Sequence, residues 1–105
     1  MIAVIVKFQV KDEVKKQLAN VDVARKHIQK VVEGCRNIPG LREKFFIMDP
    51  ETYAQGAMLI WESREQFEEY MKSEEYQETV LDICEGDPSV EVYVHTANLI
   101  DGVLI

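Results

Sequence analysis

The strongest constraint on the fold lies in residues 39–76, where a pair of strands runs directly into a helix. Residues 41–49 and 56–62 are rich in apolar and aromatic side chains, as strands are. The DPET sequence between them favours a turn, because proline fixes φ one residue into the bend. Ser63, with Gln66 three residues later, forms a capping box, which indicates a helix start. We therefore predict a β-hairpin with a helix attached to its second strand.

The remaining segments predict two further strands and a further helix. Residues 2–8 form a nearly unbroken apolar run rich in β-branched side chains, which is typical of a strand buried on both faces. Between residues 21 and 38, apolar side chains recur at spacings of three and four. This period predicts a helix with Asn20 or Asp22 as its N-cap. Residues 89–97 alternate valine with polar side chains at their start and predict the last strand.

Less regular stretches separate these elements. Residues 9–20 are polar and allow a short helix of their own. The helix that begins after Ser63 is expected to break near Ser73 and to resume until the Gly-Asp-Pro sequence at residues 86–88 ends it. Residues 98–105 are expected to form an apolar tail.

The order β-α-β-β-α-β predicts a ferredoxin-like α+β fold, with residues 1–105 as a single domain. Its four-stranded antiparallel sheet has the spatial order 4-1-3-2. Residues 2–6 and 57–61 are apolar on both faces and suit the two central strands. The second and fourth strands carry charged side chains and suit the edges.

Two helices can cover only one face of such a sheet, although its central strands are apolar on both. Ala3 and Ile5 point away from Val4 and Val6, so the second face also needs an apolar cover. A second copy of the chain, packed sheet against sheet about a two-fold axis, supplies that cover. We therefore expect a homodimer, with the apolar tail reaching across or capping the seam.

Composition and charge exclude several classes of partner. The 105-residue chain has a net charge of −7, whereas nucleic acids and anionic membranes attract basic surfaces. No apolar run reaches the roughly 20 residues of a membrane span, and the N-terminus lacks the basic flank and cleavage site of a signal peptide. We expect a cytoplasmic protein without nucleic-acid or membrane partners, in which Cys35 and Cys84 stay reduced.

The element order, with Pro-Gly-Leu at residues 39–41 and Trp-Glu-Ser at residues 61–63 bounding the hairpin, resembles the antibiotic biosynthesis monooxygenase superfamily. The resemblance implies a dimeric α+β barrel with a pocket between the sheet and the helices of each protomer. It also implies a range of activities, because characterised members include cofactor-free oxygenases of polycyclic phenols, quinol oxygenases and haem degraders.

The functional residues of the superfamily carry over only in part. Trp61 occupies the place of the strand-end tryptophan of the cofactor-free oxygenases, whereas Ala57 and Phe67 stand where those enzymes have asparagine and tyrosine. The asparagine, tryptophan and histidine of the haem degraders are replaced by Lys7 or Phe8, Tyr70 and Val80. We therefore expect neither haem nor another cofactor.

The candidate site residues are one histidine and four aromatic side chains. His27 lies at the margin of an apolar helix face and, with Tyr70, is the candidate for acid–base catalysis; the alternative is a boundary histidine packed on the core. Trp61, Phe67 and Tyr76 are the candidate substrate-binding residues, although aromatic side chains at helical spacing are more often plain core. No further histidine or cysteine stands at metal-ligand spacing, so we predict no metal site.

The last strand carries a second polar cluster. His95, Glu91 and Tyr93 share one strand face, near Lys7 on the neighbouring strand. They fit either a proton-transfer cluster or a polar seam at the sheet edge or dimer interface.

The sequence thus predicts a protein that binds a small apolar or aromatic molecule, with two alternatives for its activity. One is a cofactor-independent monooxygenase of a phenolic or polycyclic aromatic substrate. Its pocket would position the phenol, favour its deprotonation and exclude water while the anion meets oxygen. The other is a non-catalytic ligand-binding or assembly module of the same fold.

Overall fold

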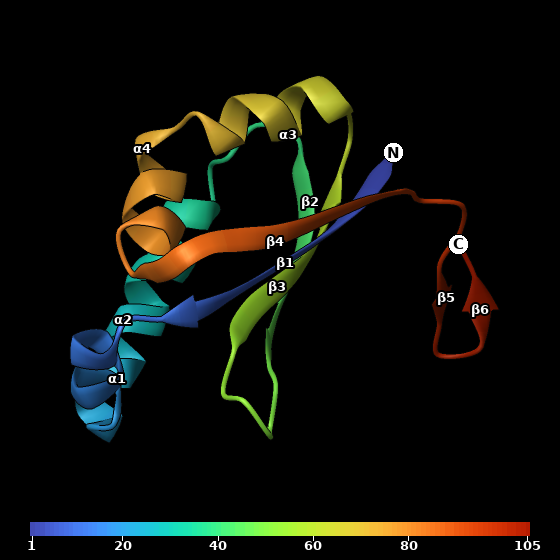
Figure 1. Cartoon of the computed structure of the whole chain (residues 1–105). Helices are drawn as coiled ribbons and strands as arrows, with labels where there is room; N and C mark the ends of the chain where they lie inside the picture. Colours follow the sequence, from blue (N-terminus) through green and yellow to red (C-terminus); the bar gives the residue numbers. More distant parts are fainter.

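The computed structural model describes residues 1–105 and contains a four-stranded antiparallel sheet, helices against one of its faces, and a small C-terminal hairpin (Figure 1). The elements are β1 (Ile2–Val10), α1 (Asp12–Leu18), α2 (Val21–Cys35), β2 (Leu41–Met48), β3 (Gln55–Trp61), α3 (Arg64–Met71), α4 (Glu74–Tyr76), the π-helical turn η1 (Gln77–Leu81), β4 (Cys84–Val94), β5 (Leu99–Ile100) and β6 (Val103–Leu104). None of the helices has both the length and the hydropathy that a membrane span requires.

The strand order β2-β3-β1-β4, read from its other edge, is the predicted order 4-1-3-2. β1 pairs antiparallel with both β3 and β4, and β3 pairs antiparallel with β2. The prediction of a ferredoxin-like α+β fold is therefore confirmed. The two runs that are apolar on both faces, β1 and β3, occupy the centre, and the strands with more charged side chains form the edges.

Helices α2, α3 and α4 begin at side-chain caps, at positions that the sequence indicates. The Asn20 side chain accepts a hydrogen bond from the backbone N–H of Asp22 at 3.0 Å, so Asn20 is the N-cap of α2. The Ser63 hydroxyl accepts from the backbone N–H of Gln66 at 3.3 Å, so the helix start predicted at Ser63 is confirmed. In place of the reciprocal backbone bond of a capping box, the Ser63 hydroxyl donates to the Gln66 side-chain oxygen at 3.1 Å. Ser73 also caps α4 with its side chain and marks the predicted break.

The expected boundary between the last helix and the last strand is wrong. The helical segment ends at Leu81 and β4 already begins at Cys84, so residues 86–88 lie inside the strand. A register shift between Lys7 and Gln9 of β1 accommodates the Gly-Asp-Pro sequence opposite them. Proline is tolerated there because β4 is an edge strand.

Residues 98–105 form a hairpin rather than a simple tail. Asp101 and Gly102 connect β5 to β6 with φ values of 51° and 77°, the left-handed conformation that a two-residue hairpin turn requires. The apolar residues of this hairpin are 44% to 74% exposed. Figure 1 shows the hairpin apart from the sheet, on the side away from the helices. An isolated two-stranded hairpin is only marginally stable in water, so this one needs a further contact.

The core lies between the sheet and the helical segments α3, α4 and η1. Its nine buried residues are Val4, Val6, Ala57, Leu59, Trp61, Phe67, Tyr70, Tyr76 and Val80. Of the fifteen residues of α2, only Val31 is fully buried. α2 therefore covers the sheet without filling the space beneath it.

The sheet face opposite the helices is uncovered and apolar at its centre, with Glu91 of β4 beside Ile5 at its edge. Ile5, Met58 and Phe45 are direct neighbours across β1, β3 and β2. Phe45 is 54% exposed and Met58 is 45% exposed, and Tyr93 on β4 is 50% exposed. A contiguous apolar area of this kind marks an interface more often than a free surface.

Candidate functional site

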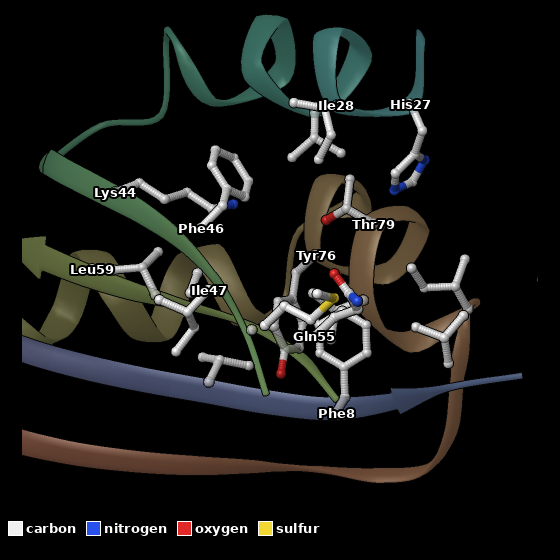
Figure 2. Close-up of a pocket in the computed structure, with 18 of the residues that line it drawn as sticks. Phe8, His27, Ile28, Lys44, Phe46, Ile47, Gln55, Leu59, Tyr76 and Thr79 are labelled. Carbon is white, nitrogen blue, oxygen red and sulfur yellow. The ribbon is translucent and has the colours of Figure 1, made fainter. Parts of the chain in front are cut away.

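A cavity of about 310 Å³ lies between α2 and the sheet (Figure 2). α2 closes it on one side, β1, β2 and β3 line the opposite side, and the segment α4–η1 contributes a further wall. Sixteen of its 21 lining residues are hydrophobic, so the cavity suits an apolar ligand. The side chains that bring polar groups to the lining are His27, Lys44, Gln55, Tyr70, Tyr76 and Thr79.

Short side chains on facing elements explain why this space is open. Ala24 of α2 and Ala57 of β3 both line the cavity, and neither extends beyond Cβ. Ile28 lines it from α2 while remaining 45% exposed. Trp61 and Phe67, which are bulkier, lie outside the lining, in the core around the other end of β3.

Four aromatic side chains pack in a row from the core to the cavity. Trp61 contacts Phe67 at 5.7 Å between ring centroids and Tyr70 at 5.2 Å. Tyr70 in turn contacts Tyr76 edge to face at 5.4 Å. Tyr70 and Tyr76 line the cavity together with His27, whereas Trp61 and Phe67 lie in the core behind them and are outside the lining.

Trp61 is completely buried, with an exposed fraction of 0%. Its indole N–H has no hydrogen-bond partner. An unpaired buried donor costs on the order of 1–3 kcal/mol, which the packing of the large ring against Phe67 and Tyr70 offsets. This arrangement is that of a core residue that supports the cavity from behind.

Burial keeps the two cavity tyrosines protonated. Desolvation raises the pKa of Tyr70 well above its usual value, and the nearby Cys35 thiol adds to the rise. Desolvation also raises the pKa of Tyr76, with Cys84 as the second cause. Two neutral phenols therefore line the cavity, and a neutral phenol is a hydrogen-bond donor rather than a base.

His27 stands where the cavity meets a groove between α2 and the segment α4–η1. Burial lowers the pKa of His27, and the positive charge of Lys30 lowers it further. The imidazole is therefore neutral at pH 7 and can accept a proton.

Lys44 and Gln55 line the cavity but were not expected there from the sequence. Lys44 Nζ donates to Cys35 Sγ at 3.3 Å and lies 4.9 Å from the centroid of the Phe46 ring. Side chains two apart on a strand share a face, and Lys44, Phe46 and Met48 all line the cavity, to which Ile47 also contributes. This alternation is the signal that could have placed Lys44 there.

The polar residues predicted for the strand over residues 89–97 lie away from the cavity. Glu91 and Tyr93 belong to β4, whereas His95 follows it, because the strand ends at Val94. The Tyr93 hydroxyl donates to the Glu91 carboxylate, which raises the pKa of Tyr93, and His95 hydrogen-bonds with Asn98. None of Glu91, Tyr93 and His95 lines the cavity. No three His, Cys, Asp or Glu side chains are grouped so that they could hold a metal ion.

The topology and the cavity together define a ferredoxin-like α+β protein with an apolar pocket under one helix. The family described as antibiotic biosynthesis monooxygenase matches residues 1–81. The chain therefore belongs to the antibiotic biosynthesis monooxygenase family, and the predicted resemblance is confirmed. Among curated proteins, none matches the chain in sequence.

Solved structures give the same fold. A protein from Methanosarcina mazei Go1 is 15% identical, with a TM-score of 0.64 over 90% of this chain and 92% of that one. A protein from Mycobacterium tuberculosis is 16% identical, with a TM-score of 0.65 over 90% of this chain and 94% of that one. A structure described as an antibiotic biosynthesis monooxygenase is 17% identical, with a TM-score of 0.67 over 91% and 99%. At these identities the likeness bears on the fold alone.

Proposed function

We propose that each protomer binds one small, largely apolar molecule in the cavity beneath α2. The cavity itself carries this proposal, because it measures about 310 Å³ and 16 of its 21 lining residues are hydrophobic. A cavity of roughly 150 Å³ can hold benzene, so this one suits a molecule of about two fused rings. Membership of the family supports the same assignment.

Within this function, the ligand is a phenolic or polycyclic aromatic substrate that is oxygenated without a cofactor. Neutral His27 is the candidate base that takes the phenolic proton. Tyr70 and Tyr76, both protonated, are candidate donors to the oxyanion that forms. The phenol and O₂ give a quinone and water. One oxygen atom of O₂ becomes the new carbonyl oxygen of the quinone, and the other leaves as water with two hydrogens from the substrate.

The second candidate function is a non-catalytic ligand-binding or assembly module. Ala57 lines the cavity without a polar group, and Phe67 lies in the core, at the two places where the resemblance implies an asparagine and a tyrosine in the cofactor-free oxygenases. These two replacements favour binding without chemistry.

Oxygen uptake with a panel of naphthols, without added reductant, distinguishes the two candidates. The rate should rise with pH as His27 loses its proton, with a midpoint below the usual histidine pKa of about 6.5, because burial and Lys30 both lower the pKa of His27. In His27→Gln the rate should fall about 100-fold. Lys30→Gln should keep the rate and move the rise to higher pH, since it removes a charge that lowers this pKa. Binding without uptake would support the module.

Binding itself is tested by filling the cavity. Ala24→Phe places a ring in the space that the ligand needs, so 2-naphthol should bind about 100-fold more weakly, as measured by calorimetry. Val23→Phe is the matched control, because Val23 lies on the same helix, is 42% exposed and does not line the cavity. Equal affinities of both variants for 2-naphthol would contradict the assignment of this cavity as the binding site.

The chain is also proposed to form a homodimer, joined through the uncovered sheet face. Ile5, Met58 and Phe45 give this face an apolar centre, and the exposed hairpin of residues 98–105 extends the apolar area of each copy. A stable dimer of this kind should bury more than about 1,200 Å². A cytoplasmic location belongs to the same proposal and agrees with the two cysteines, which are both free.

A further inference from the structure

The cavity opens at one end onto a surface depression rich in cations. Lys44 and Phe46 line both the cavity and this depression, which also includes Arg36 and Arg42. Glu43 is its only acidic residue. Three cations around one opening stand out in a chain whose net charge is −7.

Lys44 is the cation of this group without a carboxylate partner. Arg36 pairs with Glu33 at 3.2 Å, and Arg42 pairs with Glu62 at 3.0 Å. No carboxylate lies within ion-pair distance of Lys44, whose contacts are instead the Cys35 thiol at 3.3 Å and the Phe46 ring. An ammonium group has three donors, so Lys44 retains hydrogens for a ligand.

The opposite end of the cavity lies near carboxylates as well as a cation. His27 and Thr79 line both the cavity and the groove beside α2, and Lys30, Glu75 and Glu78 also line this groove. Figure 2 shows Lys44 and His27 on opposite sides of the cavity, with apolar side chains between them. An anionic group is therefore attracted to the Lys44 end and repelled by the carboxylates at the His27 end.

We propose that the ligand of this cavity is an amphipathic carboxylate whose acid group binds Lys44 while its apolar body fills the cavity. This inference rests on the proposed function as a small-molecule binder and adds the charge and the orientation of the ligand. The carboxylate accepts charge-assisted hydrogen bonds from Lys44 Nζ at the opening, where it keeps part of its hydration. The aromatic or aliphatic body then extends toward the His27 end, so that a phenolic group on its far side would meet the candidate base.

The test compares 2-naphthoate with 2-naphthamide, which have the same size and shape but differ in charge. Titration calorimetry at pH 7.5 and low salt should give about tenfold tighter binding of 2-naphthoate to the unmodified chain. Lys44→Gln should abolish this preference while leaving the affinity for 2-naphthamide within about twofold. Lys30→Gln is the matched control, because it removes one positive charge at the other end of the cavity and should keep the preference.

The possible outcomes separate this inference from the proposed function. Equal binding of the two probes to the unmodified chain would overturn the role of Lys44 and leave the cavity as a site for neutral ligands. A preference for 2-naphthoate that survives in Lys44→Gln, or that disappears in Lys30→Gln, would also overturn it. If neither probe binds, both the inference and the proposed binding of fused-ring molecules are wrong.

Discussion

A Met58→Glu variant is expected to be monomeric at concentrations at which the unmodified chain is a dimer. Met58 lies at the centre of the uncovered face, between Ile5 on β1 and Phe45 on β2. In the proposed dimer, a carboxylate there would enter the apolar contact between the two sheets, where burial of an unpaired charge is strongly unfavourable. The dissociation constant of the dimer should rise at least about 1,000-fold, which corresponds to about 4 kcal/mol.

Sedimentation velocity over a concentration series measures this change. Gln29→Glu is the control, because it adds the same charge at an exposed position of α2, on the far side of the sheet. Truncation after Ala97, which removes the exposed hairpin, should weaken the dimer without abolishing it. An unmodified chain that sediments as a monomer at about 50 μM would refute the sheet-to-sheet dimer.

Most of the fold could be predicted because local patterns and global topology agree in this chain. The doubly apolar runs of β1 and β3 identify the central strands, and the Asn20 and Ser63 caps locate two helix starts. β1 runs two residues beyond the predicted end at Phe8, and the larger exceptions lie after residue 81. Gly-Asp-Pro at residues 86–88 ends helices in most contexts, but here the edge position of β4 and a bulge opposite it admit these residues into a strand.

The sequence of the C-terminal hairpin contains a turn motif, but the apolar residues on both sides of it made the hairpin hard to recognise. Asp101-Gly102 between two apolar pairs is a strong two-residue turn sequence. Residues 98–105 were nevertheless interpreted as a tail, because a hairpin with no polar face lacks the alternation that identifies a half-buried strand. Such a hairpin makes physical sense only if both of its faces meet other protein surface.

The candidate site could be predicted only in part, because a sequence does not show whether an aromatic side chain borders a cavity or is packed on all sides. His27, Tyr70 and Tyr76 were expected at the site and line the cavity. The charged side chains of the second strand indicate an edge strand, but they do not show that Lys44 lines the cavity, with its Nζ 4.9 Å from the centroid of the Phe46 ring. The alternation along the strand indicates which face Lys44 shares with Phe46. Its contact with Cys35 of α2 depends on tertiary packing that no local pattern encodes.

Trp61 shows this limit most clearly, and its replacement should have a large effect on stability. Its place at the end of β3 suits the mouth of a cavity, yet it is completely buried against Phe67 and Tyr70. Trp61→Ala should therefore lower the free energy of unfolding by about 3–5 kcal/mol. Trp61→Phe should lower it by only about 1 kcal/mol, because the loss of volume is partly offset by removal of the unpaired indole N–H.

Denaturant unfolding at one fixed protein concentration measures both changes, since association contributes to the stability of a dimer. Calorimetry with 2-naphthol supplies the second measurement, and Trp61→Phe should bind this ligand within about twofold of the unmodified chain, because Tyr70 rather than Trp61 lines the cavity. A loss of affinity of about tenfold at nearly unchanged stability would instead make Trp61 a binding residue. The two measurements together separate a residue that touches the ligand from one that positions Tyr70 from behind.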